Sequence, residues 1–343
     1  MYRNTNRLKG FLPKFPAAVL VLLFAAFPLF AQRKVTIKLA SLVPENTPWG
    51  AAINRMADSW AAATNGEVEL VVYHNGVAGE EDEVLRKLRM NQIQAAIVTS
   101  SGLSSVSPDV MTLSYPLLIH NDDELEAVLS KLKPELEAKM TQGGFVTLAW
   151  ARAGWVKIFS RSAVFTPGEL RRQKLGTTPD DLKMIQAFKT MGFQMVPINL
   201  NDVLVSLNGG MIDAIFQSPI YVAGSQAFGV AKNMSTVNLA PFMGGILMNQ
   251  IAWRRIPEKY RDKLLAICKQ IEGEIDTSIA KLEGEAVSTM IRYGLVVNEV
   301  NPQQLQEWYN DINRHENELA GPVFNKDFYN KIRAILADYR KGK

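Results

Sequence analysis

A strand–helix–strand–helix–strand rhythm between residues 35 and 100 constrains the fold more than any other feature. The stretches 35–42, 68–73 and 94–100 have the β-branched and apolar composition of strands. Helical patterns begin between them, at Thr47-Pro48 and at the acidic run 80–83. This alternation predicts a parallel sheet with right-handed crossovers. Ligands of such sheets bind beyond the carboxyl ends of the strands, so we expect the functional residues there.

The second half of the chain repeats the rhythm. Segments 144–152 and 156–161 are predicted to be strands that cross between the halves, and further strands are expected at 173–177, 193–198 and 211–218. Helices are expected at 179–191, 201–208, 257–293, 302–319 and 327–341. We therefore predict an α/β fold of two lobes with parallel-rich mixed sheets. Many two-domain enzymes share this plan, so the fold alone does not settle the function.

The first 31 residues predict an export signal. Four basic residues and no acidic one precede an apolar run, 17–31, which has the length of a signal core and is short for a membrane span. Ala31 stands at a plausible cleavage point, and no cysteine lies near it for lipid attachment. We expect a periplasmic protein, with an uncleaved N-terminal anchor in the inner membrane as the alternative.

The charge balance argues against a nucleic-acid partner. The chain has 38 basic and 34 acidic residues, and its net charge of +4 comes from the four basic residues of the signal. The remaining chain is neutral and shows no basic stripe with interleaved aromatic residues.

Motifs for catalysis or metal binding are missing from the sequence. His74, His120 and His315 stand in separate contexts, and His74 is expected to be a solvated turn residue. Cys268, the single cysteine, falls on an apolar helical stripe, which predicts a buried, inert thiol. The acidic runs 80–83, 122–124 and 180–181 are explained by helix starts, where negative charge is favourable. We expect no enzyme, no metal and no cofactor.

Several collinear stretches carry a family resemblance. The chain from about residue 35 to 270 resembles the periplasmic solute-binding subunits of TRAP transporters, the DctP type. The matching stretches are 39–50, 64–85, 95–104, 113–124, 165–176, 191–219 and 256–267.

The resemblance implies a two-lobed "Venus flytrap" that closes on a small molecule and delivers it to the TRAP membrane permease, without making or breaking a bond. It also implies a long helix, 257–293, that braces both lobes. The expected division is a signal or anchor (1–31), lobe I (32–150), lobe II (151–245) and a C-terminal helical segment (246–343). Some relatives work with a tetratricopeptide-repeat accessory protein, which is a further expected partner.

Two departures from the family pattern bear on the ligand. The family's carboxylate-gripping arginine falls at Gly176, and a second basic residue falls at Val156, with Lys157 one place later and so on the other strand face. Gly176 is expected to allow close approach of the ligand or an unusual backbone angle. We therefore expect an apolar or neutral solute. A sensor or interaction module, and a receptor for an organic acid that uses a different basic group, are the alternatives.

Aromatic residues gather near the predicted strand ends and crossing segments, where they could line an interlobe cleft or belong to the core. The expected ligand-binding residues are Val43, Tyr73, Tyr115, Trp150, Trp155, Gly176, Phe216, Gln217 and Tyr221.

Overall fold

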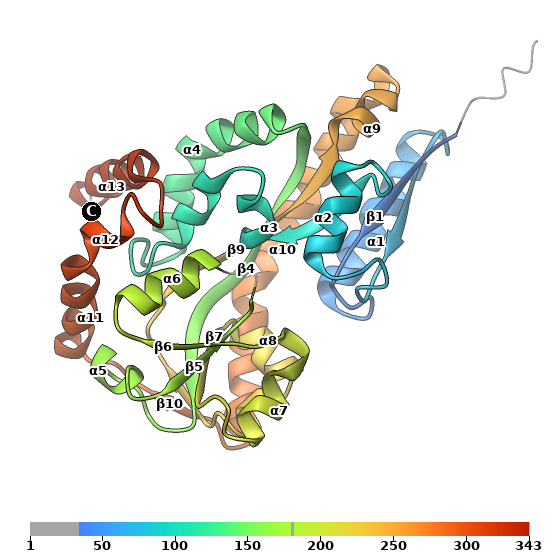
Figure 1. Ribbon diagram of the computed structural model, residues 1–343. Helices are drawn as coiled ribbons and strands as arrows, with labels where there is room; N and C mark the ends of the chain where they lie inside the picture. The colour runs from blue at the N-terminus through green and yellow to red at the C-terminus, as the bar shows by residue number, and fades with distance from the viewer. Residues whose placement is uncertain (1–33, 180–181, 343) are drawn as a thin grey trace, which may run out of the picture. The chain divides into compact units, whose positions relative to one another are not determined.

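Ten strands frame the part of the chain that the computed structural model describes, residues 34–179 and 182–342 (Figure 1). Eight of them lie in the order β2-β1-β3-β9-β4-β7-β5-β6, with β8 and β10 to the side of β4. The strands are β1 Val35–Ala40, β2 Val68–Tyr73, β3 Ala95–Thr99, β4 Phe145–Ser160, β5 Lys174–Thr177, β6 Gln194–Pro197, β7 Ala214–Gln217, β8 Asn233–Ser235, β9 Ala240–Asn249 and β10 Val296–Asn298. The predicted signal and the acidic pair 180–181 lie outside the described residues.

Strands β1, β2 and β3 pair in parallel, as the rhythm predicts. The connecting helices are α1 (Pro48–Ala63), α2 (Glu81–Arg89) and the short α3 (Ser100–Ser104). Thr47 caps α1 by accepting a hydrogen bond from the amide of Gly50, and Pro48 occupies the first turn. The apolar stripe of α1, centred on Met56 and Trp60, is buried against β1, β2 and β9.

Strands β5, β6 and β7 form a second parallel set, with β5 in the middle. Its helices are α5 (Pro167–Leu170), α6 (Leu182–Thr190), α7 (Val203–Asn208) and α8 (Pro219–Gly224), with α9 (Gln250–Arg255) later in the chain. Short 3₁₀ turns lie at Pro108–Ser114 (η1), Leu200–Asp202 (η2) and Ala227–Gly229 (η3). Both predicted parallel units are therefore confirmed.

One long strand, β4, joins the two sets. It pairs antiparallel with β9 on one edge and with β7 on the other. The predicted break between strands 144–152 and 156–161 is wrong, because the chain continues through a bulge between Arg152 and Trp155. Gly154 makes the bulge with a φ of +87°, which glycine adopts without strain.

Strand β9 has no counterpart among the predicted strands. Its residues Gly244 and Gly245 weaken a strand pattern in sequence. A Cβ at Gly244 would lie 2.7 Å from the carbonyl oxygen of Val98, and one at Gly245 would lie 3.2 Å from that of Ala149. The glycines are needed because the neighbouring strands approach closely on both sides.

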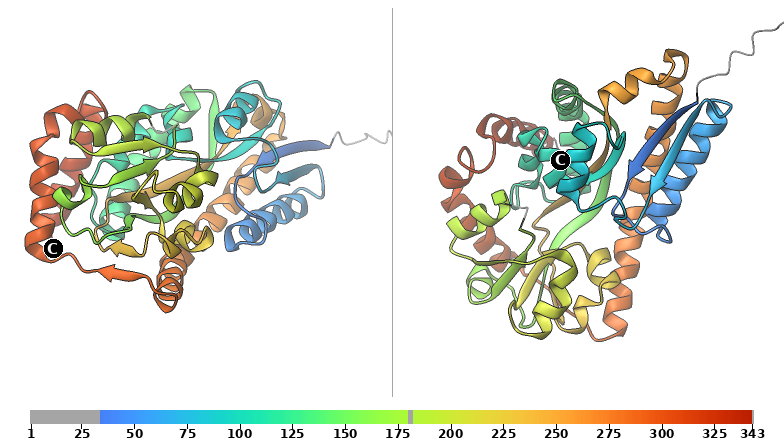
Figure 2. Two further views of the ribbon diagram at one scale, coloured as in Figure 1. Left: turned by 60° about the horizontal axis from the view of Figure 1, so that its bottom comes forward. Right: turned by 45° about the vertical axis from the view of Figure 1, so that its right-hand side comes forward.

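Helix α10 (Glu258–Arg292) runs along β4, as Figures 1 and 2 show, and confirms the predicted long helix to within one residue at each end. Two of its carboxylates accept hydrogen bonds from backbone amides in the irregular part of β4. Glu272 accepts from Trp150 at 3.0 Å and Glu283 accepts from Trp155 at 3.0 Å. Between them, Asp276 pairs with Arg152 at 3.4 Å. Cys268 of α10 is fully buried, as predicted, and burial raises the pKa of its thiol to about 12.

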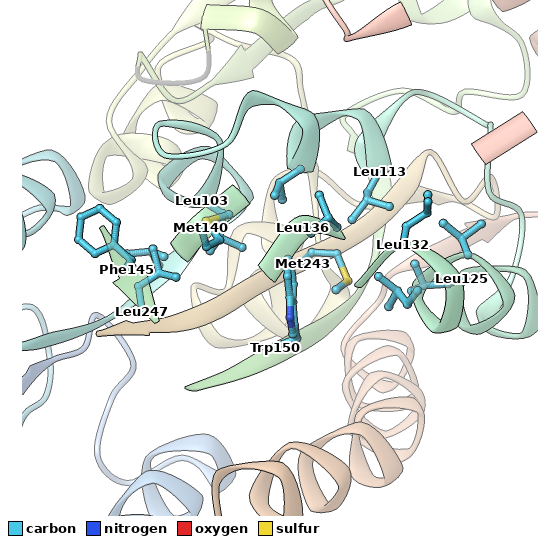
Figure 3. Close-up of a cluster of buried hydrophobic side chains, with 14 of the residues drawn as sticks. Leu103, Leu113, Leu125, Leu132, Leu136, Met140, Phe145, Trp150, Met243 and Leu247 are labelled. Atoms are coloured by element: carbon cyan, nitrogen blue, oxygen red, sulfur yellow. The ribbon is translucent and has the colours of Figure 1, made fainter. Parts of the chain in front are cut away.

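The remaining helices pack on two apolar clusters. Helix α4 (Asp122–Gln142) and helix α13 (Lys326–Lys341) share the first cluster, which includes Leu132, Leu336 and Met243; Figure 3 shows its α4 part. Helices α11 (Pro302–Arg314) and α12 (Glu316–Leu319) contribute to a second cluster with α6 and β5. Helix α13 reaches both clusters, through Leu336 and Tyr329. The predicted lobe boundaries at residues 150 and 245 fall inside the continuous strands β4 and β9. They therefore stay a prediction.

Glu283 offers a test of how α10 supports β4. Burial raises the pKa of its carboxyl group, and Lys157 opposes that rise while Asp122 adds to it. A folded protein that holds this proton more tightly than the unfolded chain loses stability as the pH rises from 4.5 through the folded-state pKa. Glu283→Gln removes the charge and keeps an acceptor for the Trp155 amide. We expect it to match or exceed wild-type stability at pH 7, with an advantage that shrinks towards pH 4.5.

Glu283→Leu is the contrasting variant, because it removes the acceptor. We expect it to cost about 1–3 kcal/mol of unfolding free energy, the range for a buried amide left without a partner. Urea unfolding at pH 5 and at pH 8 measures both variants. Equal stabilities for the two variants at both pH values would contradict the role of Glu283 as acceptor.

Candidate functional site at the strand ends

The carboxyl ends of β1, β2 and β3 meet at one edge. The pair Ala40↔Tyr73 puts the ends of β1 and β2 side by side, and the pair Ala40↔Ala96 puts β3 next to β1, from where β3 continues to Thr99. The loop after β1 is tied to the turn after β2, since Asn75 donates to the carbonyl of Val43 at 3.2 Å and Gly76 donates to that of Ser41 at 3.0 Å. Val43 and Tyr73 are half-buried at this edge. The structure thus brings these two predicted site residues together.

Two polar side chains, Glu81 and His74, form hydrogen bonds at this edge. Glu81, at the start of α2, accepts hydrogen bonds from the amide and the hydroxyl of Thr99, at 2.6 and 2.8 Å. His74 is 7% exposed, so the expected solvated turn histidine is wrong. Its Nε2 lies 2.9 Å from Oδ1 of Asn54 on α1, which draws the ring under the turn.

The ends of β5, β6 and β7 form the corresponding edge of the second set. Phe216 stacks on Phe188 of α6, with ring centres 5.1 Å apart and planes 8° apart. Gln217 is half-buried, and its side-chain oxygen accepts from the amide of Ser218 at 3.3 Å. Tyr221 is half-buried on α8, where burial raises the pKa of its hydroxyl. Phe216 and Gln217 thus end β7, and Tyr221 follows in the helix after it.

Gly176 lies in the central strand β5, and its surroundings are aliphatic. A Cβ at this position would lie 2.7 Å from Cδ1 of Ile212 and 3.1 Å from Cδ1 of Ile198. Gly176 has no positive φ, so the suggestion of an unusual backbone angle is wrong. The groups that approach Gly176 closely are the side chains of Ile198 and Ile212. Val156, which is predicted to fall at the second basic position of the family, packs against the apolar cluster of α6 and β5.

Three predicted site residues pack in the core instead. Trp150 lies in the first apolar cluster (Figure 3). It is 3% exposed and donates through Nε1 to Glu137 of α4 at 3.1 Å. Trp155 is buried in the same way, and its Nε1 donates to Asp122 at 3.1 Å. Tyr115 lies between the rings of Phe324 and Tyr329, at 5.0 and 4.6 Å. A ligand contact for these three residues stays a prediction.

Cations are scarce at the two edges. The relevant segments are the loops that follow the six parallel strands, together with the first turns of the helices after those loops. In these segments the sequence has a single lysine or arginine, Lys183. Among the described residues, the same segments contain Glu45, Glu80, Glu81, Asp82, Glu83 and Asp202. An anion would therefore meet far more negative than positive charge there.

The cations of the crossing strand are held by other groups. Arg152 pairs with Glu126 and Asp276. Lys157 donates to Oδ1 of Asn238 at 2.7 Å, and burial lowers the pKa of its ammonium group. Sequence reasoning identified Lys157, but Ile198 and Ile212 were missed. Their only signal in the sequence is that of ordinary core residues.

The family model for bacterial extracellular solute-binding proteins, family 7 (DctP), matches residues 39–320. The chain belongs to this family. It is 20% identical to a C4-dicarboxylate-binding protein of Bacillus subtilis, over 90% of this chain and 88% of that protein. It is 21% identical to a periplasmic C4-dicarboxylate-binding protein of Vibrio cholerae, over 80% of this chain and 83% of that one.

Solved structures of TRAP periplasmic solute-binding proteins share the fold. One from Xanthobacter autotrophicus, with bound β-D-galacturonate, matches with a TM-score of 0.79 at 18% identity, over 88% of this chain and 99% of that one. A Bordetella pertussis receptor that binds pyroglutamic acid gives the same TM-score and coverage at 20% identity. The chain is thus a solute-binding protein of this family, and it has the two-lobed fold of the solved TRAP receptors.

Two further findings concern the described residues only. Within 34–179 and 182–342, none of the helices has the length and apolar character that a membrane crossing requires. The same residues hold no group of three or more histidine, cysteine, aspartate or glutamate side chains placed to bind a metal ion.

Gly176→Ala tests the packing at the end of β5. The added methyl group meets Ile212 and Ile198, so we expect a loss of about 1–3 kcal/mol, as for other overpacked cores. Gly168→Ala in α5 is the control, because its Cβ would have a single neighbour, Thr166, at 3.9 Å. Ile212→Val should recover part of the loss in the double variant. Chemical unfolding measures all three, and an unchanged Gly176→Ala would refute the close contact.

Proposed function

We propose that this protein is a periplasmic receptor that binds an apolar or neutral small molecule between its lobes and delivers it to a TRAP membrane permease. The expected ligand contacts are the strand-end residues Val43, Tyr73, Phe216, Gln217 and Tyr221. One observation supports the neutral ligand above others. Gly176 is predicted to stand at the position of the family's carboxylate-gripping arginine, and Ile198 and Ile212 occupy the space beside it.

The charges at the strand ends support the same proposal. A buried carboxylate on a ligand needs a cation or several N–H donors, or its desolvation costs several kcal/mol. Lys183 is the single cation of these segments, and the cations of β4 are engaged by Asp276 and Asn238. A neutral ligand avoids this cost.

An organic acid is the second candidate, because the relatives named above bind acids. Lys183, half-buried in the first turn of α6, is the basic group that such a ligand would use. A lysine is a point charge without the bidentate fork of arginine, so it would grip a carboxylate less specifically.

Competition between matched compounds tests the two candidates. The protein, purified from periplasm, is equilibrated with a metabolite mixture that contains acids and their neutral counterparts, for example D-galacturonate with D-galactose and pyroglutamate with 2-pyrrolidinone. Mass spectrometry then identifies what the dialysed protein retains. We expect a neutral compound at high occupancy. A retained acid whose binding disappears in Lys183→Met would establish the second candidate instead.

Gly176→Arg is the sharpest variant of the site. An arginine there must displace Ile212 and Ile198 and bring an unpaired charge into an aliphatic setting. We expect the affinity for the native ligand to fall about tenfold or more, a loss of about 1.4 kcal/mol, without tight binding of organic acids, because Val156 leaves the second basic position empty. Calorimetry measures both, with Gly168→Arg as the control. Unchanged affinity would place Gly176 outside the site.

A further inference from the structure

A cavity of about 410 Å³ lies away from the strand ends, between the segment Tyr115–His120 and helices α11 and α13. Its volume falls within the range of about 300–1,000 Å³ that is usual for small-molecule sites. The cavity borders both apolar clusters, since Leu336 belongs to the first and Tyr329 to the second. Figures 1 and 2 show α11, α12 and α13 following one another on this side of the fold.

Aromatic rings form much of its wall. Tyr115 and Tyr329 lie with ring centres 4.6 Å apart, and His120 lies 5.0 Å from Tyr309. The His120 ring is fixed, because its Nε2–H donates to the Leu117 carbonyl at 3.0 Å while Nδ1 accepts from Arg340 at 3.2 Å. Burial, together with the charge of Arg340, lowers the pKa of His120, so it stands here as a neutral ring.

Hydrogen bonds to Glu124 and Leu118 hold the Arg340 side chain in the wall of the cavity. Its guanidinium donates to both oxygens of Glu124, at 2.8 and 2.7 Å, and to the carbonyl of Leu118 at 3.1 Å. Glu124 is buried, and burial alone would raise the pKa of its carboxyl. The hydrogen bonds from Arg340 and from the His120 amide instead hold that pKa below its usual value.

Arg333 has donors to spare. Among the described residues its one hydrogen bond runs from Nη1 to Glu316 at 3.0 Å, and its guanidinium lies 5.5 Å from the centre of the Tyr329 ring. A guanidinium carries five N–H groups, so donors remain for a further acceptor. None of the described residues that line the cavity is acidic. Glu124 and Glu316, which pair with Arg340 and Arg333, are not among the lining residues.

We propose that this cavity is a second binding site, for a small aromatic monocarboxylate. Its carboxylate meets the half-exposed guanidinium of Arg333, and its ring packs among Tyr309, Tyr329 and Leu336. The pairing of a planar guanidinium with a carboxylate is the strong, bidentate kind. The site does not depend on which solute the strand ends take.

Calorimetry with phenylacetate and benzoate on the full protein tests the proposal. We expect saturable one-to-one binding of at least one of them, and binding of phenylacetamide about tenfold weaker or more, since it lacks the charge. Arg333→Leu should weaken the acid by a similar factor, and Arg333→Lys by less. Arg314→Leu on α11 is the matched control, because Arg314 is exposed and does not line the cavity.

Melting temperatures first establish that each variant is folded. Phenylacetamide bound as tightly as phenylacetate, no saturable binding of either acid, or affinity unchanged in Arg333→Leu and Arg333→Lys would each overturn the proposal. An acid that is lost on Gly176→Arg and retained on Arg333→Leu would do the same, because it would be bound at the strand ends.

Discussion

Strand β4 pairs with β9 on one edge and with β7 on the other, so one segment belongs to both sheets. Strand β4 is bulged around Gly154, close to where it passes from one parallel set to the other, and a bulge bends the strand that contains it. Its amides there need partners in a buried place, and the carboxylates of α10 accept two of them. The long helix and the crossing strand thus support each other, and the parallel strand ends on either side depend on that support.

The chemistry of the strand ends follows from what fills them. The middle of the second edge has a glycine covered by the tips of two isoleucines. The surrounding segments are rich in carboxylates, which helix starts favour, and contain one lysine. Solved relatives hold acids in the same fold. A shared fold positions a site without fixing its chemistry, and here the side chains at the edge argue for a different kind of ligand.

Periodicity was sufficient to predict the parallel units and the long helix, because β1, α1 and α10 are locally consistent in propensity and pattern. It could not predict β9, where Gly244 and Gly245 are required by neighbouring carbonyl groups that are distant in sequence. Nor could periodicity predict which side chains of β4 are buried. That strand has α4 on one side and α10 on the other, so Trp150 is buried although it lies near a crossing point. Alignment with the family located Gly176, but the isoleucines that cover it come from other segments.

The account rests on a neutral ligand at an aliphatic strand edge. The most direct measurement is a crystal structure of the protein with the ligand that it carries from the periplasm. The account predicts electron density between the strand ends, near Phe216, Gln217 and Tyr221, for a molecule without a carboxylate. A carboxylate held in that density by Lys183, or by Lys157 after release from Asn238, would contradict it.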